Sequence, residues 1–268
     1  MALARVQVYR LAIVAAVVAA LLVRLPPAHA ADWIELPPEA GQPAVFVSVL
    51  KAPVPGRAPV ALMLHGGEGL TRDFIAAFET WAKWLGQRGV ASVIIDGFRG
   101  RGVRGSEETT GSKYMPLVRG RGIDVERTMA WLAKSDWADP ARAFVFGQSM
   151  GGSVGITVAV ERKLTIPQVP FYPYCTLQMM APMQPRAGYP PSLWLIGAAD
   201  RTAPPADTRK CFDRITAAGN PDVIRWVLLE NTPHMFDRRP NGPGYSGTAV
   251  EASKTEIDAF LKARGLIR

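Results

Sequence analysis

The chain has little of several features that would place it in other protein classes. Its 268 residues include two cysteines and three histidines. It lacks a lysine-rich tail, internal repeats and low-complexity tracts, which argues against a nucleic-acid-binding, structural or adhesive protein. After the first thirty residues, no apolar run approaches the ~20 residues that span a bilayer. The few histidines and the absence of a clustered carboxylate set argue against a zinc site, and we expect neither a metal nor an organic cofactor.

The first thirty residues have the pattern of a secretory signal peptide. Arg5 and Arg10 precede an apolar run at 11–23, and an A-x-A sequence stands at 28–30. An uncleaved membrane anchor is the alternative, but the apolar run is short for a membrane span. We therefore expect cleavage after residue 30 and an exported protein, periplasmic or secreted, without stable membrane association. The remaining residues, 31–268, are expected to form a single domain.

Cys175 and Cys211 are the two cysteines of the chain. In an exported protein an even pair favours a disulfide, and two buried free thiols are the alternative. The bridge would close a loop of about 36 residues and stabilise the fold by roughly 3–4 kcal/mol. Neither cysteine lies in a strand–turn–helix setting, so we do not expect a cysteine nucleophile.

Apolar runs alternate with helix-like segments along the chain. The expected strands and helices, in chain order, are strand 59–64, helix 71–87, strand 90–95, helix 124–134, strand 142–146, helix 151–160, strand 193–196, helix 205–218, strand 223–229 and helix 248–264. This alternation predicts an α/β fold with a mostly parallel central sheet and helices on both faces. The segment 44–50 is expected to add one or two antiparallel strands at an edge.

The pentapeptide Gly147-Gln148-Ser149-Met150-Gly151 is the most informative stretch of the chain. It lies between an apolar strand and a helix rich in small residues. A strand that turns straight into a helix brings backbone against backbone, so a Cβ at either glycine would clash. Such a turn presents a serine hydroxyl beside a helix N-terminus that favours developing negative charge. A glycine- and serine-rich turn without chemistry is the alternative.

Two further residues complete a catalytic triad in the sequence. Ligands bind beyond the carboxyl ends of parallel strands, and Ser149, Asp200 and His234 all follow expected strands. A serine needs a nearby base, and a histidine needs a carboxylate that orients it. The order Ser149, Asp200, His234 is that of α/β-hydrolases. We therefore predict these three as nucleophile, acid and base.

The loop at 65–69 is expected to supply the rest of the catalytic apparatus. The backbone N–H groups of Met150 and Gly67 are predicted to form the oxyanion hole. A plain glycine turn is the alternative for this loop. His65 and Glu68, at either side of its first glycines, are weaker candidates for substrate binding. The position of His65 at the end of a strand is better suited to shaping the backbone.

Two other segments are candidates for setting specificity. Residues 97–122 are rich in arginine and glycine. The segment is interpreted either as a mobile lid, in which Arg99 and Arg101 bind a carboxylate-bearing substrate, or as a solvated loop. Residues 170–191 are rich in proline, methionine and aromatics. That composition is typical of core packing, and a wall of an apolar pocket is the alternative.

The motifs together resemble the dienelactone hydrolase family of the α/β-hydrolase superfamily. They are HGGEGL at 65–70, DGFRGRG at 96–102, GQSMGG at 147–152, GAADRTAPP at 197–205 and NTPHMFD at 231–237. The resemblance implies an α/β-hydrolase fold and the triad roles given above. The chain departs from the best-known dienelactone hydrolases at Ser149, where they carry a cysteine. That departure favours a more general ester over dienelactone.

The sequence thus predicts an exported serine hydrolase that cleaves small carboxylic esters or lactones through an acyl-enzyme. A peptidase or acyltransferase would use the same triad. A non-catalytic exported binding protein on a hydrolase scaffold is the alternative from another class.

Overall fold

An eight-stranded sheet forms the centre of the part of the chain that the computed structural model describes, residues 33–240 and 242–268. The expected signal peptide lies outside these residues. The strands are β1 Trp33–Leu36, β2 Val45–Leu50, β3 Ala58–Leu64, β4 Ala91–Asp96, β5 Ala138–Gln148, β6 Gln168–Phe171, β7 Ser192–Gly197 and β8 Ile224–Leu229. Their order is β1-β2-β4-β3-β5-β6-β7-β8. β1 and β2 are antiparallel additions at one edge; β2 was expected from 44–50, whereas β1 lies before that segment. β4, β3 and β5 to β8 run parallel.

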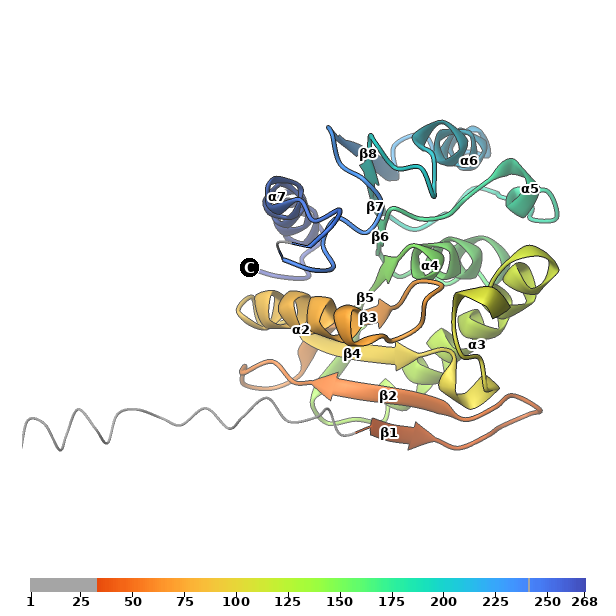
Figure 1. The fold of residues 1–268 in the computed structure, drawn as a ribbon. Coiled ribbons are helices and arrows are strands. Elements are labelled where there is room, and N and C mark those ends of the chain that lie inside the picture. Colours follow the sequence, from red (N-terminus) through yellow and green to blue (C-terminus); the bar gives the residue numbers. More distant parts are fainter. Residues whose placement is uncertain (1–32, 241) are drawn as a thin grey trace, which may run out of the picture. The chain divides into compact units, whose positions relative to one another are not determined.

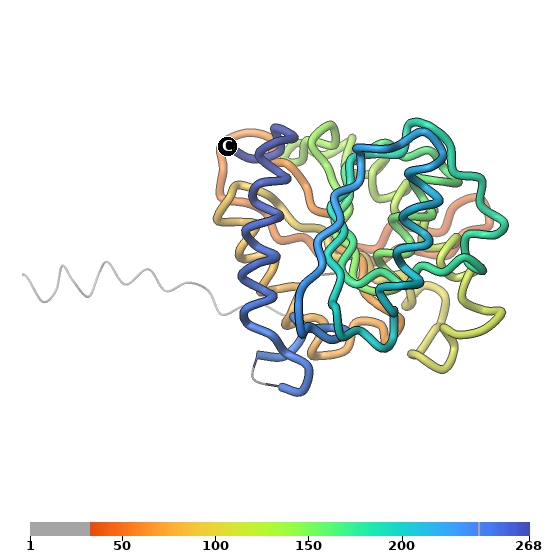
Figure 2. Tube along the Cα trace, turned by 90° about the horizontal axis from the view of Figure 1, so that it is seen from above, coloured from red at the N-terminus to blue at the C-terminus, as the bar shows by residue number. Residues whose placement is uncertain are grey.

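Helices cover both faces of this sheet, which confirms the predicted α/β architecture (Figure 1). They are α2 Arg72–Gly86, α3 Tyr114–Leu132, α4 Met150–Glu161, α5 Leu177–Met180, α6 Pro205–Ala217 and α7 Gly247–Ala263. α2 and α7 pack on one face, and α3, α4 and α6 pack on the other. Figure 2 shows the dark-blue α7 and the teal α6 on opposite sides of β8.

The central strand β3 shows why the parallel strands appear in the sequence as continuous apolar runs. All seven of its residues are buried. Ala61 and Met63 pack with Trp81 of α2 on one face. Leu62 and Leu64 pack with α3 and α4 on the other face. A strand covered on both sides has no position for a polar side chain, so it lacks the alternation of a half-exposed strand.

Several elements differ from the sequence expectation, among them β1 and α5, which the sequence pattern did not indicate. α3 begins at Tyr114, ten residues before the predicted start at residue 124. Its buried face carries Arg121 and Gly122 besides apolar residues, which weakens the helical pattern of apolar positions. β6 was not predicted, because it has only four residues and includes Pro170, which demotes a strand assignment.

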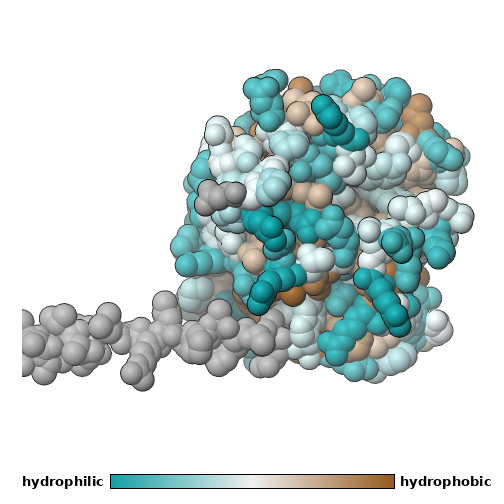
Figure 3. All heavy atoms as spheres, viewed as in Figure 1, coloured by the Kyte–Doolittle hydropathy of each residue, from teal (hydrophilic) through white to brown (hydrophobic). Residues whose placement is uncertain are grey.

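The surface of the described part is largely polar. Figure 3 shows hydrophilic and weakly polar residues over most of the face that it presents, with apolar residues in small groups. The exposed large apolar side chains among the described residues are Ile34, Val54, Leu177 and Leu228. Within 33–240 and 242–268, no helix has the length and apolar character needed to cross a membrane.

Candidate active site

Ser149 occupies the sharp turn between β5 and α4, as the G-x-S-x-G pattern predicts. Its φ of 51° and ψ of −116° lie in a region that few non-glycine residues adopt. Its N–H donates to the carbonyl oxygen of Phe171 at 3.0 Å, which ties the turn to β6. A Cβ at Gly147 would lie 2.4 Å from the carbonyl oxygen of Gly151, and one at Gly151 would lie 2.0 Å from that of Leu64. Both glycines are therefore required by the close approach of the backbone.

The structure brings Ser149, His234 and Asp200 together in a hydrogen-bonded chain. His234 Nε2 lies 3.0 Å from Ser149 Oγ. His234 Nδ1 lies 2.6 Å from Asp200 Oδ2. The His234 side chain is 7% exposed and that of Asp200 is fully buried. Because a carboxylate oxygen only accepts, His234 donates from Nδ1 and presents Nε2 as an acceptor for the serine proton.

Strand pairing explains how residues 34 positions apart meet. β7 and β8 pair in parallel, with Gly197 opposite Leu229, so the loops that follow them leave the sheet side by side. The first loop carries Asp200 and the second carries His234. Asp200 Oδ1 accepts from the N–H groups of Thr202 and Ala203, both at 2.8 Å. These bonds fix the carboxylate and leave Oδ2 for the histidine.

Gly67 and Met150, the predicted oxyanion donors, both border the same pocket as Ser149. Met150 is the first residue of α4, so its N–H has no acceptor within the helix. The helix dipole adds positive potential at this end. Space around Gly67 is limited, since a Cβ there would lie 3.1 Å from Thr109 Oγ1.

The side chain of His65, the first residue of the 65–69 loop, is completely buried and shut off from solvent, so it does not line a substrate site, contrary to its expected role. Its Nδ1 lies 2.8 Å from the carbonyl oxygen of Gly66 and therefore donates. Its Nε2 accepts from the N–H of Gly97 at 3.2 Å. Burial, aided by the charge of Arg121, lowers the pKa of His65 well below its usual value and keeps the ring neutral.

The hydrogen bond from His65 also orients the Gly66–Gly67 peptide. In a trans peptide the C=O and N–H point in opposite directions. Fixing the Gly66 carbonyl toward His65 therefore turns the Gly67 N–H away from it. Arg121 supports the same turn, because its Nη2 donates to the carbonyl oxygen of His65 at 2.8 Å. His65 and Arg121 thus hold the 65–69 loop, which carries the predicted oxyanion donor Gly67, from its buried side.

Glu68, Arg99 and Arg101, the other candidates for substrate binding, do not line the pocket beside Ser149 and contact other parts of the protein. Glu68 accepts from Arg238 at 2.7 Å. The Arg99 guanidinium lies 4.0 Å from the centre of the Phe46 ring. Arg101 makes a bidentate bond to Asp124, at 2.6 and 3.0 Å. A carboxylate already satisfies Arg101, so it is not available to a substrate.

A buried carboxylate that the sequence did not reveal lies behind the histidine. Asp237 is three residues after His234 and accepts three side-chain hydrogen bonds, from Trp81 at 2.7 Å, Gln148 at 2.5 Å and Tyr172 at 2.6 Å. Burial raises the pKa of Asp237, and the three donors oppose that rise. The Tyr172 ring packs edge-on against His234, with ring centres 4.7 Å apart. Asp237 therefore links Gln148, which precedes Ser149, to Tyr172, which packs against His234.

A pocket of about 560 Å³ opens beside Ser149. This volume is within the range of small-molecule sites, ~300–1,000 Å³. It is lined by Gly67, Thr109, Thr110, Gly111, Ser112, Tyr114, Met115, Ser149, Met150, Tyr174, Thr176, Gln178, Met179 and Thr202. The segment 170–191 has both expected roles: Met179, Met180 and Met183 are buried in the core, and Tyr174 and Met179 also line the pocket.

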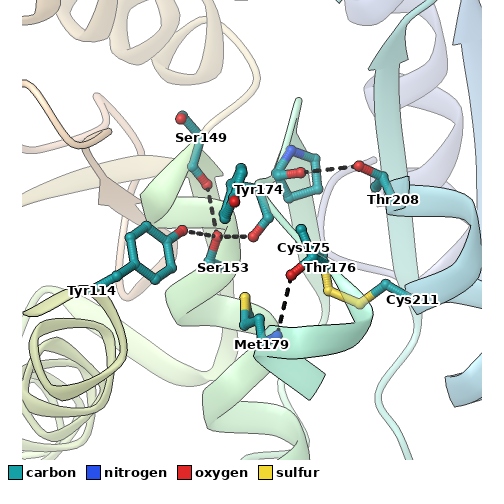
Figure 4. The surroundings of a disulfide bond; sticks show 10 residues. Tyr114, Ser149, Ser153, Tyr174, Cys175, Thr176, Met179, Thr208 and Cys211 are labelled. Carbon is teal, nitrogen blue, oxygen red and sulfur yellow. Dashed lines mark hydrogen bonds between the residues drawn. A yellow bond between two sulfur atoms is a disulfide. The ribbon is translucent and has the colours of Figure 1, made fainter. Parts of the chain in front are cut away.

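The predicted disulfide is present and lies behind this pocket wall (Figure 4). Cys175 and Cys211 are bonded, with Cα atoms 5.9 Å apart. Tyr174 and Thr176, on either side of Cys175, both line the pocket. The bond therefore joins the wall to α6. Residues 33–240 and 242–268 hold no group of three histidine, cysteine, aspartate or glutamate side chains placed to bind a metal ion.

Sequence comparison finds few similar proteins. No family model matches the chain. Two Mycobacterium tuberculosis proteins, from strains CDC 1551 / Oshkosh and H37Rv and both named only as uncharacterized, are 30% identical over 107 residues, or 40% of this chain. The chain matches about a third of the length of these curated relatives, 34% in each case.

Similar solved structures are those of esterase 2 from Thermogutta terrifontis. The form phosphorylated by paraoxon superposes with a TM-score of 0.69 at 18% identity, over 92% of this chain and 98% of that one. The propionate-bound form has a TM-score of 0.64 at 18% identity, over 90% and 97%. The chain therefore has the α/β-hydrolase fold. Membership of the dienelactone hydrolase family stays a prediction.

Proposed function

We propose that the protein is a serine esterase that hydrolyses small carboxylic esters or lactones. The observation that carries the proposal is the chain of contacts from Ser149 Oγ through His234 to Asp200, at 3.0 and 2.6 Å. A histidine within hydrogen-bond distance of a serine, and oriented by a buried carboxylate, is the arrangement that makes a serine nucleophilic.

In the first half of the reaction, Ser149 Oγ attacks the ester carbonyl carbon while its proton passes to His234 Nε2. The carbonyl oxygen takes the electron pair and is stabilised by the N–H groups of Gly67 and Met150. Asp200 stabilises the imidazolium. The tetrahedral intermediate then collapses, the carbon–oxygen bond to the alcohol breaks, and the histidine gives its proton to the leaving oxygen.

In the second half, water takes the place of the alcohol. His234 removes a proton from the water as its oxygen attacks the acyl carbon, and the same two N–H groups bind the oxyanion. Collapse breaks the bond to Ser149 Oγ, which recovers its proton from the histidine. The products are the carboxylic acid, the alcohol and the free enzyme, with no change of oxidation state.

The similar structures support this proposal. Thermogutta terrifontis esterase 2 is described as phosphorylated by paraoxon, and as bound to propionate. We infer that Ser149 reacts in the same way with an organophosphate. A peptidase or acyltransferase would share the triad, and substrate profiling separates these activities from an esterase.

Labelling tests the proposal directly. After incubation with paraoxon, intact-protein mass spectrometry is expected to show one added diethylphosphoryl group, and peptide mapping is expected to place it on Ser149. Ser149→Ala should abolish the label. Ser253→Ala on α7, which does not line the pocket, is the matched serine control and should retain it. An unlabelled wild-type protein, or a label that persists in Ser149→Ala, would contradict the proposal.

We also propose that the protein acts outside the cytoplasm. The support is the signal-like pattern of residues 1–30 and the bond between Cys175 and Cys211, since disulfides persist in oxidising compartments. N-terminal sequencing of the protein recovered from the producing cells tests this. A mature protein that begins at residue 31 is expected, and an intact N-terminus in the cytoplasmic fraction would contradict it.

A further inference from the structure

We propose that the pocket beside Ser149 binds the acyl arm of the ester, and that this arm is uncharged and largely apolar. The inference rests on the proposed esterase function and names its substrate class. It predicts that the acyl chain, more than the alcohol, determines which esters the protein hydrolyses.

The position of the triad decides which arm enters the pocket. The leaving oxygen must lie near His234 Nε2, because that atom returns the proton to it. Residues 231–237, all described, form the loop that carries His234, and none of them lines the pocket. The wall beside Ser149 is instead formed by Gly67 and Met150, which are placed to bind the oxyanion. The alcohol therefore leaves on the histidine side, and the acyl arm extends into the pocket.

The chemistry of the lining determines the kind of arm. Its larger side chains are three methionines and two tyrosines, Met115, Met150, Met179, Tyr114 and Tyr174. The remaining polar groups are hydroxyls and one amide. Burial raises the pKa of Tyr114, which keeps its hydroxyl neutral. Methionine fills irregular apolar space and adapts to different chains.

Among the described residues, no charged side chain lines the pocket, and the two arginines Arg101 and Arg121 are already bonded to other groups. Arg101 is held by both oxygens of Asp124. Arg121 is buried and donates to the His65 carbonyl. Neither lines the pocket. A carboxylate on the acyl arm would lose its hydration without gaining a counter-charge, which is strongly unfavourable.

The pocket is held open by bonds within its wall. In Figure 4, Ser153 lies between Tyr114 and the backbone of Tyr174. The Tyr114 hydroxyl and Ser153 Oγ are 2.7 Å apart. Ser153 donates to the carbonyl oxygen of Tyr174 at 2.5 Å, so Tyr114 is the donor of the first bond. With the disulfide at Cys175, these bonds attach the wall to α3, α4 and α6, and the space is preformed for a ligand.

Isomeric esters test which arm the pocket binds. Methyl hexanoate and pentyl acetate have the same composition but place the long chain on opposite sides of the carbonyl. Each methylene buried by the pocket favours the hexanoate about fourfold, or ~0.8 kcal/mol. We expect kcat/KM for methyl hexanoate to exceed that for pentyl acetate by at least about tenfold. Equal values, or a preference for pentyl acetate, would overturn the assignment of the acyl arm.

A second pair tests the charge. 4-Nitrophenyl hexanoate and mono-4-nitrophenyl adipate have acyl chains of equal length, and the adipate ends in a carboxylate. We expect kcat/KM to be about 100-fold lower for the adipate, because its carboxylate finds no counter-charge. Comparable values for the two esters would overturn the uncharged class.

Two variants test whether the preference for the acyl arm arises in the pocket. Met179→Trp fills the space and is expected to reduce kcat/KM for methyl hexanoate at least tenfold more than for methyl acetate. Leu177→Trp changes the exposed neighbour on α5, which does not line the pocket, and should leave both values close to wild type. Equal losses for both esters in Met179→Trp would overturn the acyl pocket. Absence of Ser149-dependent hydrolysis of every ester would instead overturn the proposed function, so the two failures are distinct.

Discussion

The α-carbon of Gly147 faces the carbonyl of Gly151 across the turn that carries the nucleophile, so that a Cβ on Gly147 would lie 2.4 Å from the Gly151 oxygen. No flexible side chain is available to give way, because the obstacle is backbone. The position of Ser149 Oγ therefore depends on two residues that carry no side chain.

Gly147→Ala is expected to lower the free energy of unfolding by several kcal/mol or to prevent folding, since the backbone of the turn must shift. Gly86→Ala is the matched control. It lies at the end of α2, where a Cβ meets nothing within 4 Å, and should be neutral or stabilising by up to ~1 kcal/mol. Urea denaturation measures both. A Gly147→Ala protein with wild-type stability and activity would contradict the close-approach argument.

The buried His65 makes stability depend on pH. The unfolded chain binds a proton near pH 6.5, whereas burial holds the folded pKa well below that value. The stability is therefore fully present above pH 6.5 and is lost as the pH falls toward the folded pKa. Between pH 7.5 and 5, the wild type should lose about 2 kcal/mol more than His65→Asn. Urea midpoints of the two proteins that fall in parallel with pH would contradict this account.

The disulfide is expected to act on both stability and substrate binding. Replacing Cys175 and Cys211 by alanine should lower the free energy of unfolding by about 3–4 kcal/mol, the loop entropy of a 36-residue separation. Because Tyr174 and Thr176 flank the bond and line the pocket, KM for methyl hexanoate should rise more than kcat falls. Steady-state kinetics on the folded variant measures this. An unchanged KM would show that the bond does not hold the wall.

The triad residues could be located from sequence because each follows a segment that the pattern identifies as a strand: β5 and β7, which are buried before Ser149 and Asp200, and the partly exposed β8 before His234. Parallel strands bring their carboxyl ends to one edge, so the chain order alone placed Ser149, Asp200 and His234 near one another. The glycines around Ser149 were informative for the same reason, since they mark where backbone meets backbone. These signals are local, and the sheet supplies the long-range geometry.

The supporting residues could not be located in this way. Asp237 meets Trp81 across 156 residues and Tyr172 across 65, and no local pattern marks a carboxylate as buried. From the sequence, Arg101 was interpreted as an unpaired cation in a loop. Its partner Asp124 lies on α3, a helix that begins earlier than the pattern of apolar residues indicated. Side-chain pairing between distant elements determines these roles, and the amino-acid pattern does not encode it locally.

Asp200→Asn tests the role given to the buried carboxylate. The amide presents a donor toward His234 Nδ1 in place of an acceptor, or swings away, so the ring loses the tautomer that accepts the serine proton. We expect kcat to fall by about 10⁴-fold with little change in the thermal midpoint. Asp207→Asn is the control, since Asp207 lies on the first turn of α6 and pairs with Lys210. A similar loss in both variants would contradict the assignment.

The most direct test is hydrolysis of a 4-nitrophenyl ester series, from acetate to decanoate, by the protein and by Ser149→Ala. The account predicts turnover that requires Ser149 and rises with acyl length until the pocket is filled. Turnover that survives in Ser149→Ala, or none with any ester in a protein that paraoxon also fails to label, would contradict the central claim that Ser149 is the nucleophile of an esterase.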